Sequence, residues 1–383
     1  MKYKKDIYLA IFGNINCCNS WSGTGFYSLR SLREIYKNIY GLNLDTNTFR
    51  YKFNKILWNF YSLFFQRNLG GFQYSERCLN ILWAEKYIRL KNNKLISFFP
   101  ILPEFIVNDP KIEKYFYIDI TLNQFFHDYG KPKFMSKKYC KSIKKREIDN
   151  YHKSCHIFTH SEYARQDIIK NYLIQPSKVT CIVPGANLPK ITKLNSNKNK
   201  KNFLKLVFVG KELHRKGLDR ILKAMEICNK NKKICELYII GGFIKNDPKL
   251  KSFKNFSNVT EYGFINKETE VKKFINIIKN SDLGLLLSRA EAGGMSLREF
   301  AYLGLPSIAV DVGGISEHLN NSSSILLNNH GEDKIIEDLS NLLIDLYENK
   351  NKLEIMQKNA KKNTKFFSWN YSWKKILSTL NKS

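Results

Sequence analysis

The stretch KLVFVGKELHRKGLDRILKAM, residues 205–225, contains the local pattern that decides the fold. Its first residues, 205–209, are a short apolar run typical of a buried strand. A basic loop, 210–217, separates this strand from an amphipathic helix. The helix has apolar residues at the i, i+3, i+4 and i+7 positions, namely Leu218, Ile221, Leu222 and Met225. The stretch therefore predicts a strand, a loop and a helix in that order.

The same alternation of strand and helix recurs along the whole chain. In the second half we expect further strands at 237–240, 259–264, 283–287 and 307–310, with helices at 268–280 and 295–303. In the first half, short apolar runs predict strands at 7–12, 95–99, 115–120, 157–159 and 179–183. Strands that alternate with helices through short turns indicate a parallel sheet covered on both faces.

Length and composition indicate two domains, and the alternation of strands and helices indicates the α/β class. The chain has 383 residues, more than one ordinary domain, and its 43% hydrophobic content excludes a disordered protein. Residues 193–202 are polar, charged and without periodicity, so we place the domain boundary there. We expect an N-terminal domain at 1–192 and a C-terminal domain at 203–365.

The chain is strongly basic, with a net charge of +29 from 63 Lys and Arg against 34 Asp and Glu. Such a charge would attract phosphates, anionic lipid or nucleic acid. The lysines are spread along the chain, which favours a compositional origin for the total charge. Only residues 131–146 are locally dense in Lys and Arg, and the sequence leaves the role of this segment undecided.

The eight cysteines show neither CxxC nor zinc-type Cys/His spacing, and Cys17 and Cys18 are adjacent. This pattern favours reduced thiols in a cytoplasm over a disulfide framework or a metal site. No apolar run approaches the roughly 18 residues of a membrane-spanning helix. Any membrane contact, for example at the inner face, would therefore be peripheral.

Three loops that come after predicted strands carry the candidate chemistry. The loop 210–217 brings Lys211 and Lys216 to the start of a helix, where cations and free amides suit an anion. The loop 288–299 places Glu291 and Glu299 around a Gly-Gly turn, and carboxylates can accept hydrogen bonds from sugar hydroxyls. A second Gly-Gly lies in 311–317. Solvated lysines, exposed helix-face acids and plain turns are the alternative interpretations.

Taken in order, these loops resemble the nucleotide-sugar half of the family 4 (group 1) glycosyltransferases, which have the GT-B fold. The strand and loop from Phe208 to Gly217 are similar to the family's strand and Lys-Gly loop. Residues 291–299 match its E-x7-E element, and 304–306 and 313–317 match the next two segments of the family pattern. The resemblance implies two Rossmann-like domains with a cleft between them. It also implies a last helix, in 366–383, that crosses back onto the N-terminal domain.

The resemblance also implies roles for individual residues. Lys211 and Lys216 would hold the donor diphosphate, Glu291 would lie by the donor sugar and β-phosphate, and Glu299 would grip the ribose. The other implied donor-binding positions are Gly23, Gly25, Gly210, Gly293, Gly294, Met295 and Ser296. The family more often has Arg at the position of Lys211 and Phe at that of Gly293, and neither change removes a charge.

The first half matches the family less closely. Gly23 and Gly25 come after the first strand and resemble a glycine-rich loop that faces the cleft, although an ordinary turn at a helix start is the alternative. Where many members carry a His or His-Asp in the cleft, this chain offers two registers for a catalytic candidate, Asp119 and His127, of which Asp119 is favoured. The aromatic stretch 58–65 could be core, an acceptor wall or an interfacial helix.

The function implied by the resemblance is retaining transfer of a hexose-type sugar from a nucleotide-diphosphate sugar to a glycan or lipid-linked acceptor hydroxyl. The resemblance implies no cofactor and no metal, and we expect no nucleic-acid partner. Polysaccharide biosynthesis would be the setting. One rival, a glycan phosphorylase, lacks support because it needs a pyridoxal lysine and a longer chain. The other rival is a catalytically silent basic protein that binds anionic glycan, lipid or nucleic acid.

Overall fold

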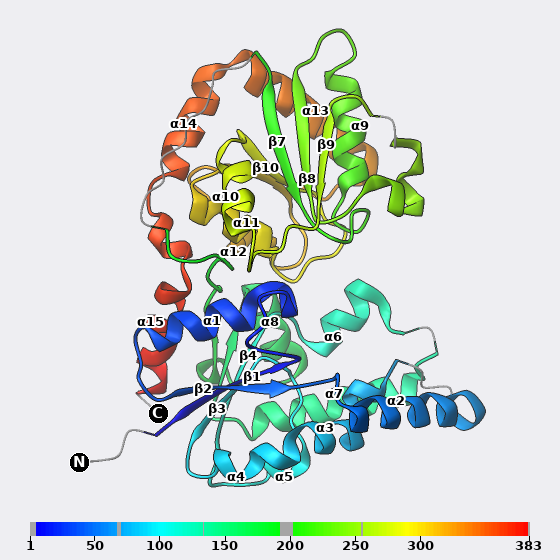
Figure 1. Cartoon of the computed structure of the whole chain (residues 1–383), viewed down its shortest axis with the longest axis vertical. Coiled ribbons are helices and arrows are strands. Elements are labelled where there is room, and N and C mark those ends of the chain that lie inside the picture. Colours follow the sequence, from blue (N-terminus) through cyan, green and yellow to red (C-terminus); the bar gives the residue numbers. More distant parts are fainter. Residues whose placement is uncertain (1–4, 67–69, 133, 192–201, 254–255, 382–383) are drawn as a thin grey trace. The chain divides into compact units, whose positions relative to one another are not determined.

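The computed structural model describes residues 5–66, 70–132, 134–191, 202–253 and 256–381 (Figure 1). The chain divides into two compact units, Met1–Val183 with Trp373–Ser383, and Pro184–Ser372. This division precedes the segment 193–202 in which the sequence places the domain boundary, and all of that segment but Asn202 lies outside the described residues. In the described residues no helix is long and apolar enough to cross a bilayer.

The first unit is built on a six-stranded parallel sheet in the order β2-β1-β3-β4-β5-β6. Its strands are β1 (Ile7–Phe12), β2 (Ile39–Leu44), β3 (Lys94–Ser97), β4 (Glu113–Ile118), β5 (His156–Thr159) and β6 (Val179–Cys181). The register pairs Ile7 with both Ile39 and Lys94. The expected strands are present. Strand β2 is an additional strand that was not predicted, because polar residues and a glycine interrupt the apolar residues of its sequence, IYGLNL.

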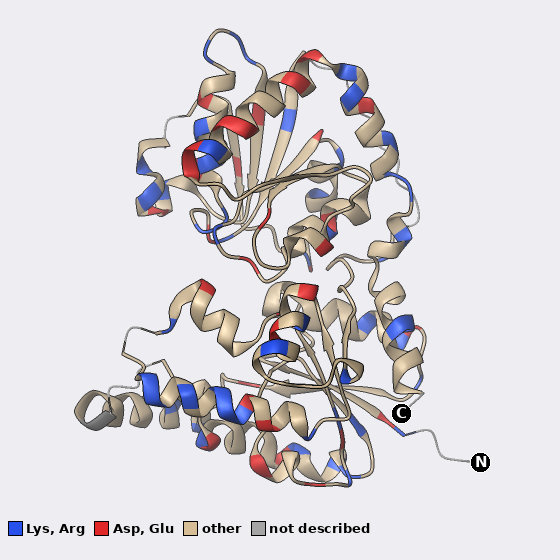
Figure 2. Ribbon diagram, turned by 180° about the vertical axis from the view of Figure 1, so that it is seen from behind, with Lys and Arg blue, Asp and Glu red and all other residues tan. Residues whose placement is uncertain are grey.

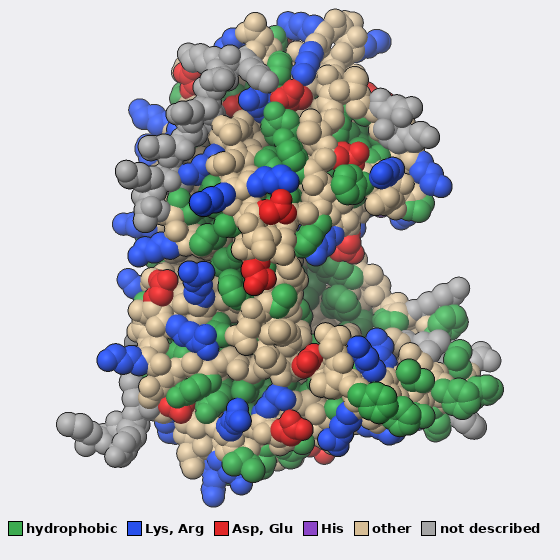
Figure 3. Space-filling view, viewed as in Figure 1, with side chains coloured by type: hydrophobic (Ala, Val, Ile, Leu, Met, Phe, Trp, Pro, Cys, Tyr) green, Lys and Arg blue, Asp and Glu red, His purple; other side chains and the backbone are tan. Residues whose placement is uncertain are grey.

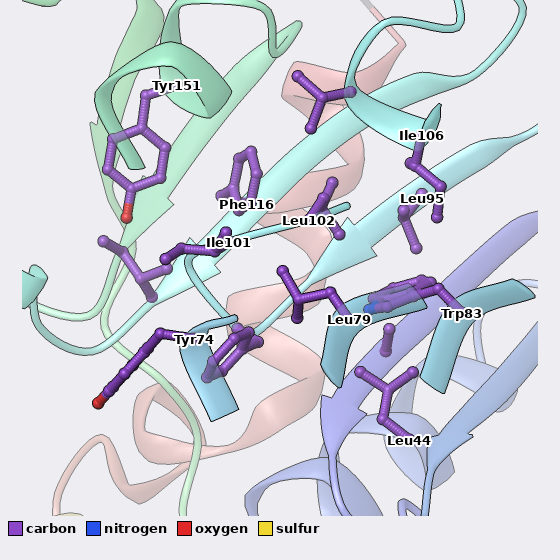
Figure 4. Close-up of a cluster of buried hydrophobic side chains, with 14 of the residues drawn as sticks. Leu44, Tyr74, Leu79, Trp83, Leu95, Ile101, Leu102, Ile106, Phe116 and Tyr151 are labelled. Atoms are coloured by element: carbon purple, nitrogen blue, oxygen red, sulfur yellow. The ribbon is translucent and has the colours of Figure 1, made fainter. Parts of the chain in front are cut away.

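The helices of the first unit pack on this sheet around a large apolar core. They are α1 (Thr24–Arg33), α2 (Phe49–Tyr61), α3 (Glu76–Trp83), α4 (Tyr87–Leu90), α5 (Glu104–Val107), α6 (Leu122–Phe125), α7 (Lys137–His152) and α8 (Glu162–Asn171). Figure 4 shows part of the core, in which Trp83 of α3 and Phe116 of β4 are fully buried. At about 25 cal/mol per Å² of apolar surface, burying aromatic side chains of this size is a main stabilising contribution.

The last helix, α15 (Trp369–Leu380), begins in the second unit and continues into the first. Trp369 donates a hydrogen bond from Nε1 to Asn187 Oδ1 at 3.0 Å, within the second unit. Trp373 is fully buried in the first unit, where its Nε1 donates to the backbone oxygen of Ser28 at 2.9 Å. The C-terminal helix thus supplies core residues to a sheet formed by the start of the chain.

The second unit has a parallel sheet in the order β12-β11-β10-β7-β8-β9. Its strands are β7 (Leu204–Val209), β8 (Cys235–Ile240), β9 (Val259–Gly263), β10 (Leu283–Leu286), β11 (Ser307–Val310) and β12 (Ile325–Leu327). Helices α9 (Leu218–Cys228), α13 (Glu332–Glu348) and α14 (Lys350–Ala360) pack on one side, and α10 (Val271–Lys279), α11 (Met295–Leu303) and α12 (Ile315–His318) on the other. The predicted class, α/β with two Rossmann-like sheets, is confirmed.

Candidate active site

The candidate site lies where the strand order of the second sheet reverses. From β7 the chain proceeds outward through β8 and β9, and it then returns to β10, on the other side of β7, and proceeds through β11 and β12. Ligands of such sheets bind beyond the carboxyl ends of the strands at this reversal. The loops after β7 and β10 meet there, since the backbone N–H of Arg289 donates to the backbone oxygen of Arg215 at 2.8 Å.

The close approach of these loops requires Gly217. This residue has a φ of 76° and precedes α9, and a Cβ added to it would lie 1.9 Å from the backbone oxygen of Leu287. A left-handed φ and the absence of space both exclude other residues at this position. The glycine of the Lys216-Gly217 pair is therefore required for the close approach of the two loops, and this approach places Lys216 against the loop after β10.

Glu291 is the centre of the charged cluster formed by the two loops. Its Oε2 accepts hydrogen bonds from Lys216 Nζ at 3.2 Å, Ser288 Oγ at 3.2 Å and Arg215 Nη1 at 3.4 Å. The side chains of Glu291 and Lys216 are only 10% and 16% exposed. Arg215 is also fixed by the backbone oxygen of Ala290, to which Nη1 donates at 2.6 Å. The structure therefore brings together two of the residues predicted for the site, Lys216 and Glu291.

These contacts decide the ionisation of Glu291. Burial alone would raise its pKa, but the charges of Lys216 and Arg215 and the hydrogen bonds from Lys216 and Ser288 outweigh burial and hold the pKa below its ordinary value. Glu291 is thus an anion held between two cations. A group in this state cannot donate a proton near neutral pH, which argues against a role as general acid.

Lys211 lies at the other end of the same loop. It is exposed, and its Nζ lies 4.3 Å from the ring centroid of Phe264, directly after β9. A cation over an aromatic face is oriented without losing its charge. Gly210 is close-packed beneath it, because a Cβ there would lie 2.4 Å from Lys216 Cδ. Lys211 and Lys216 therefore stay at the carboxyl end of β7, and Gly210 leaves the room that the Lys216 stem occupies.

Glu299 lies in α11 and has a different environment from Glu291. It is buried, and its carboxylate pairs with Lys267, in the segment after β9. Burial is the larger influence and raises the pKa of Glu299 despite the charge of Lys267. The two glutamates read as a pair from the sequence are thus held by different lysines from different loops.

The Gly293-Gly294 turn opens α11 and brings its first amides to the same edge of the sheet. Gly294 is the N-cap, with a φ of 74°, and a Cβ on Gly293 would lie 2.2 Å from His318 Nε2. The buried imidazole of His318 thus fills the space that a side chain at 293 would need. Met295 and Ser296 are the first helical residues, and the buried Ser296 Oγ has no hydrogen-bond partner within the described part of the chain.

A network of ion pairs connects residues of the two loops with α9 and α13. Arg289 donates from Nη1 and Nη2 to the Asp219 carboxylate at 2.8 Å each, and from Nη2 to Glu332 Oε2 at 2.8 Å. Arg220 donates to the same Glu332 and, from Nη1, to the backbone oxygen of Leu287 at 2.8 Å. Because each arginine binds through several fixed donors, the network fixes the loop geometry.

The first unit places its predicted residues separately. Gly23 precedes α1 with a φ of 88°, and a Cβ on Gly25 would lie 2.7 Å from Ile11 Cδ1, so Gly25 allows α1 to pack closely on β1. Asp119 is half-buried and lies directly after β4. His127 lies on η5 (Phe126–Gly130) with its side chain 87% exposed and its Nδ1 2.8 Å from Asp128 Oδ1. The choice between Asp119 and His127 stays a prediction.

Four residues near the site were not identified from the sequence. Arg215 and Ser288 contact Glu291, Lys267 contacts Glu299, and His318 lies against Gly293. Arg215 is adjacent to Lys216 in the quoted loop, so its basic character was a usable signal. Lys267 comes from a segment with no local pattern that points to it, whereas His318 directly follows the matched segment 313–317.

Residues 190–363 match the family model described as glycosyl transferases group 1. The chain is 26% identical over 351 residues to an uncharacterized glycosyltransferase of Methanocaldococcus jannaschii, a match that covers 88% of this chain and 79% of that protein. Sucrose-phosphate synthase from Thermosynechococcus elongatus superposes with a TM-score of 0.71 at 12% identity and covers 99% of both chains. S. aureus TarM, in a complex that contains UDP, superposes with a TM-score of 0.57 at 20% identity.

The TarM match covers 79% of this chain and 58% of TarM, so this chain spans less than two thirds of that protein. At these identities the solved structures establish the fold, and the family model covers the residues that form the charged cluster. The second unit is thus similar to the group 1 glycosyl transferases over residues 190–363, and the chain as a whole has the GT-B fold.

Proposed function

We propose that this protein transfers a hexose-type sugar from a nucleotide-diphosphate sugar to a hydroxyl of a glycan or lipid-linked acceptor, with retention of the anomeric configuration. The acceptor oxygen forms a bond to the anomeric carbon on the face from which the diphosphate departs. The bond between that carbon and the diphosphate breaks, its electron pair stays on the leaving phosphate oxygen, and the acceptor proton passes to that oxygen.

The observation that carries this proposal is the ionised Glu291 between Lys216 and Arg215 at the reversal of the strand order. The leaving diphosphate gains negative charge in the transition state, so preorganised cations lower the barrier. Lys216, Arg215 and Lys211 supply positive charge at the carboxyl end of β7, and the first amides of α11 face the same edge. A bound diphosphate would share these cations with Glu291, which orients them before the donor arrives.

The remaining assignments rest on the resemblance to the family. Glu299 would accept hydrogen bonds from the ribose hydroxyls, with Lys267 as its support, and the 293–296 backbone would contact the phosphates and the sugar. A metal ion is not required in this scheme, because lysine and arginine carry the charge that a divalent cation would otherwise supply. The presence of UDP in the TarM complex supports a nucleotide-diphosphate donor.

The proposal can be tested by thermal shift of the whole chain with UDP-, GDP- and ADP-sugars, in buffer with and without EDTA. We expect the nucleotide sugars of one of these three bases to raise the Tm of the protein with increasing concentration, and we expect EDTA to leave this shift unchanged. The same donor should then release its nucleoside diphosphate. A response to heparin or DNA together with no response to any nucleotide sugar would replace this proposal with that of a silent polyanion-binding protein.

A further inference from the structure

Helix α2 and the π-helical turn η2 (Ser62–Gln66) after it present an apolar face to solvent. Figure 3 shows hydrophobic side chains gathered over α2, at the lower right. Phe49 is 83% exposed and Phe64 68% exposed. The other exposed large apolar residues of this face are Phe53, Ile56, Leu57, Phe60, Tyr61 and Leu63. A contiguous group of this size on a soluble surface marks an interaction site.

The opposite face of α2 is packed, so the exposure is a property of the fold. Tyr51 is buried, and its ring centroid lies 5.3 Å from that of Phe72. The Trp58 centroid lies 6.0 Å from that of Phe72 and 5.8 Å from that of Tyr139, on α7. The hydroxyl of Thr48 caps the helix by accepting from the Tyr51 N–H. The helix is therefore fixed with Phe49, Phe53 and Phe60 exposed to solvent.

Cationic side chains flank this apolar face. Helix α2 itself carries the exposed Arg50, Lys52 and Lys55. Figure 2, which is seen from the other side, shows further basic residues along α7, the helix that contacts the packed side of α2 through Tyr139. Neither 49–64 nor 131–146 contains an acidic residue. We call the exposed apolar residues of 49–64, together with Arg50, Lys52 and Lys55, the aromatic-basic face.

We propose that the aromatic-basic face docks on the surface of a bilayer that contains anionic phospholipid. Aromatic and aliphatic side chains enter the boundary between headgroups and acyl chains, and the cations attract anionic headgroups. A second copy of this chain would oppose cations with cations, which disfavours a homodimer at this face. Protein interfaces are depleted in lysine, which disfavours a protein partner. This inference does not depend on the proposed glycosyl transfer.

The test is flotation of the full chain with vesicles of phosphatidylcholine alone or mixed with phosphatidylglycerol. We expect at least tenfold tighter binding to the mixed vesicles, with a marked loss between roughly 0.1 M and 1 M salt. The double variant Phe53→Ser/Phe60→Ser should lose at least another tenfold. The matched control, Ile88→Ser/Ile227→Ser, removes exposed apolar residues elsewhere and should bind as the parent does.

A charge variant separates the electrostatic contribution to vesicle binding from the contribution of the apolar side chains. Arg50→Glu/Lys52→Glu should weaken binding and reduce its salt dependence, whereas Lys223→Glu/Lys272→Glu, which makes the same change of charge at exposed lysines elsewhere, should have less effect. Unchanged Tm and near-UV circular dichroism would show that each variant folds. Equal binding to both kinds of vesicle, equal loss in the control variants, or a dimer that Phe53→Ser/Phe60→Ser dissociates would overturn the proposal.

Discussion

Replacing Lys216 with alanine should reduce turnover much more than it reduces stability. Two unit charges about 4 Å apart interact by about 4 kcal/mol at an effective dielectric of about 20. The desolvation of the buried Lys216–Glu291 pair offsets much of this attraction. Arg215 at 3.4 Å and Ser288 at 3.2 Å still bind Glu291 in the variant.

Because Glu291 keeps these partners, we expect Lys216→Ala to lower the free energy of unfolding by about 1 to 2 kcal/mol. That loss is smaller than the roughly 3–5 kcal/mol that results when a buried charge is left unpaired. The proposed mechanism instead uses Lys216 on the leaving diphosphate, where loss of one preorganised group costs roughly 10²–10³ in kcat, or about 3 to 4 kcal/mol.

The assay compares denaturant unfolding with release of nucleoside diphosphate, using the donor that gives the largest thermal shift. Lys233→Ala is the matched control, since it removes one lysine from the Lys233–Glu236 ion pair, at 2.9 Å, outside the site. The unfolding free energy and the turnover of Lys233→Ala should both stay close to those of the parent. Near-parental turnover in a stably folded Lys216→Ala variant would refute the role of this lysine.

Three further predictions test other parts of the second unit. Gly293→Ala should lower the unfolding free energy by about 1 to 3 kcal/mol, because the new Cβ would lie 2.2 Å from His318 Nε2. In a double-mutant cycle, His318→Ala should relieve part of that loss, and additive losses of the two single variants would contradict the contact. Burial raises the pKa of Glu299, so acidification should begin to weaken donor binding to the parent at a higher pH than it would for an ordinary glutamate. Titration calorimetry should show this, and it should show weaker binding to Glu299→Gln, with an affinity that does not change over the same pH range. Hydrogen bonds from Arg220 lower the pKa of Glu332 to about 2, so the stability that ionised Glu332 adds is present above pH 4.5 and is lost toward pH 2. The Glu332→Gln variant should be less stable than the parent by about 1 kcal/mol at pH 7, after allowance for the exposure of Glu332. In urea unfolding, the difference in unfolding free energy between parent and variant should become smaller below pH 4.5.

The sequence predicts the second sheet well because its local signals agree with one another. Residues 205–209 lie within β7, and α11 has the expected bounds, since Gly294 and Gly304 at its two ends both have a positive φ. Strand β12, which has three residues, was not predicted. Strand β2 was missed because Gly41 and Asn43 interrupt its apolar residues.

The pairing of side chains could not be read from local patterns. Glu291 and Arg215 are separated by 76 positions and meet only because β10 lies beside β7. The pairing of Glu299 with Lys267 likewise depends on the position of the segment after β9. In the stretch 58–65 the sequence left core and interface open, and the structure divides it: Trp58 packs inward, whereas Phe60 and Phe64 are exposed.

The two glutamates that mark the site in the sequence have opposite electrostatic environments. Two cations and a hydroxyl keep Glu291 ionised, so it can orient Lys216 and Arg215 and then share them with a diphosphate. Burial of Glu299 outweighs the hydrogen bond from Lys267 and the charges of Lys267 and Lys216, so its pKa is raised, and its charged form becomes more favourable when further donors approach it. Ribose hydroxyls are such donors, and binding a ribose should therefore lower the pKa of Glu299. On this argument donor binding near the pKa of Glu299 releases protons, which calorimetry in buffers of different ionisation enthalpy would detect, whereas binding to Glu299→Gln should release none from this position.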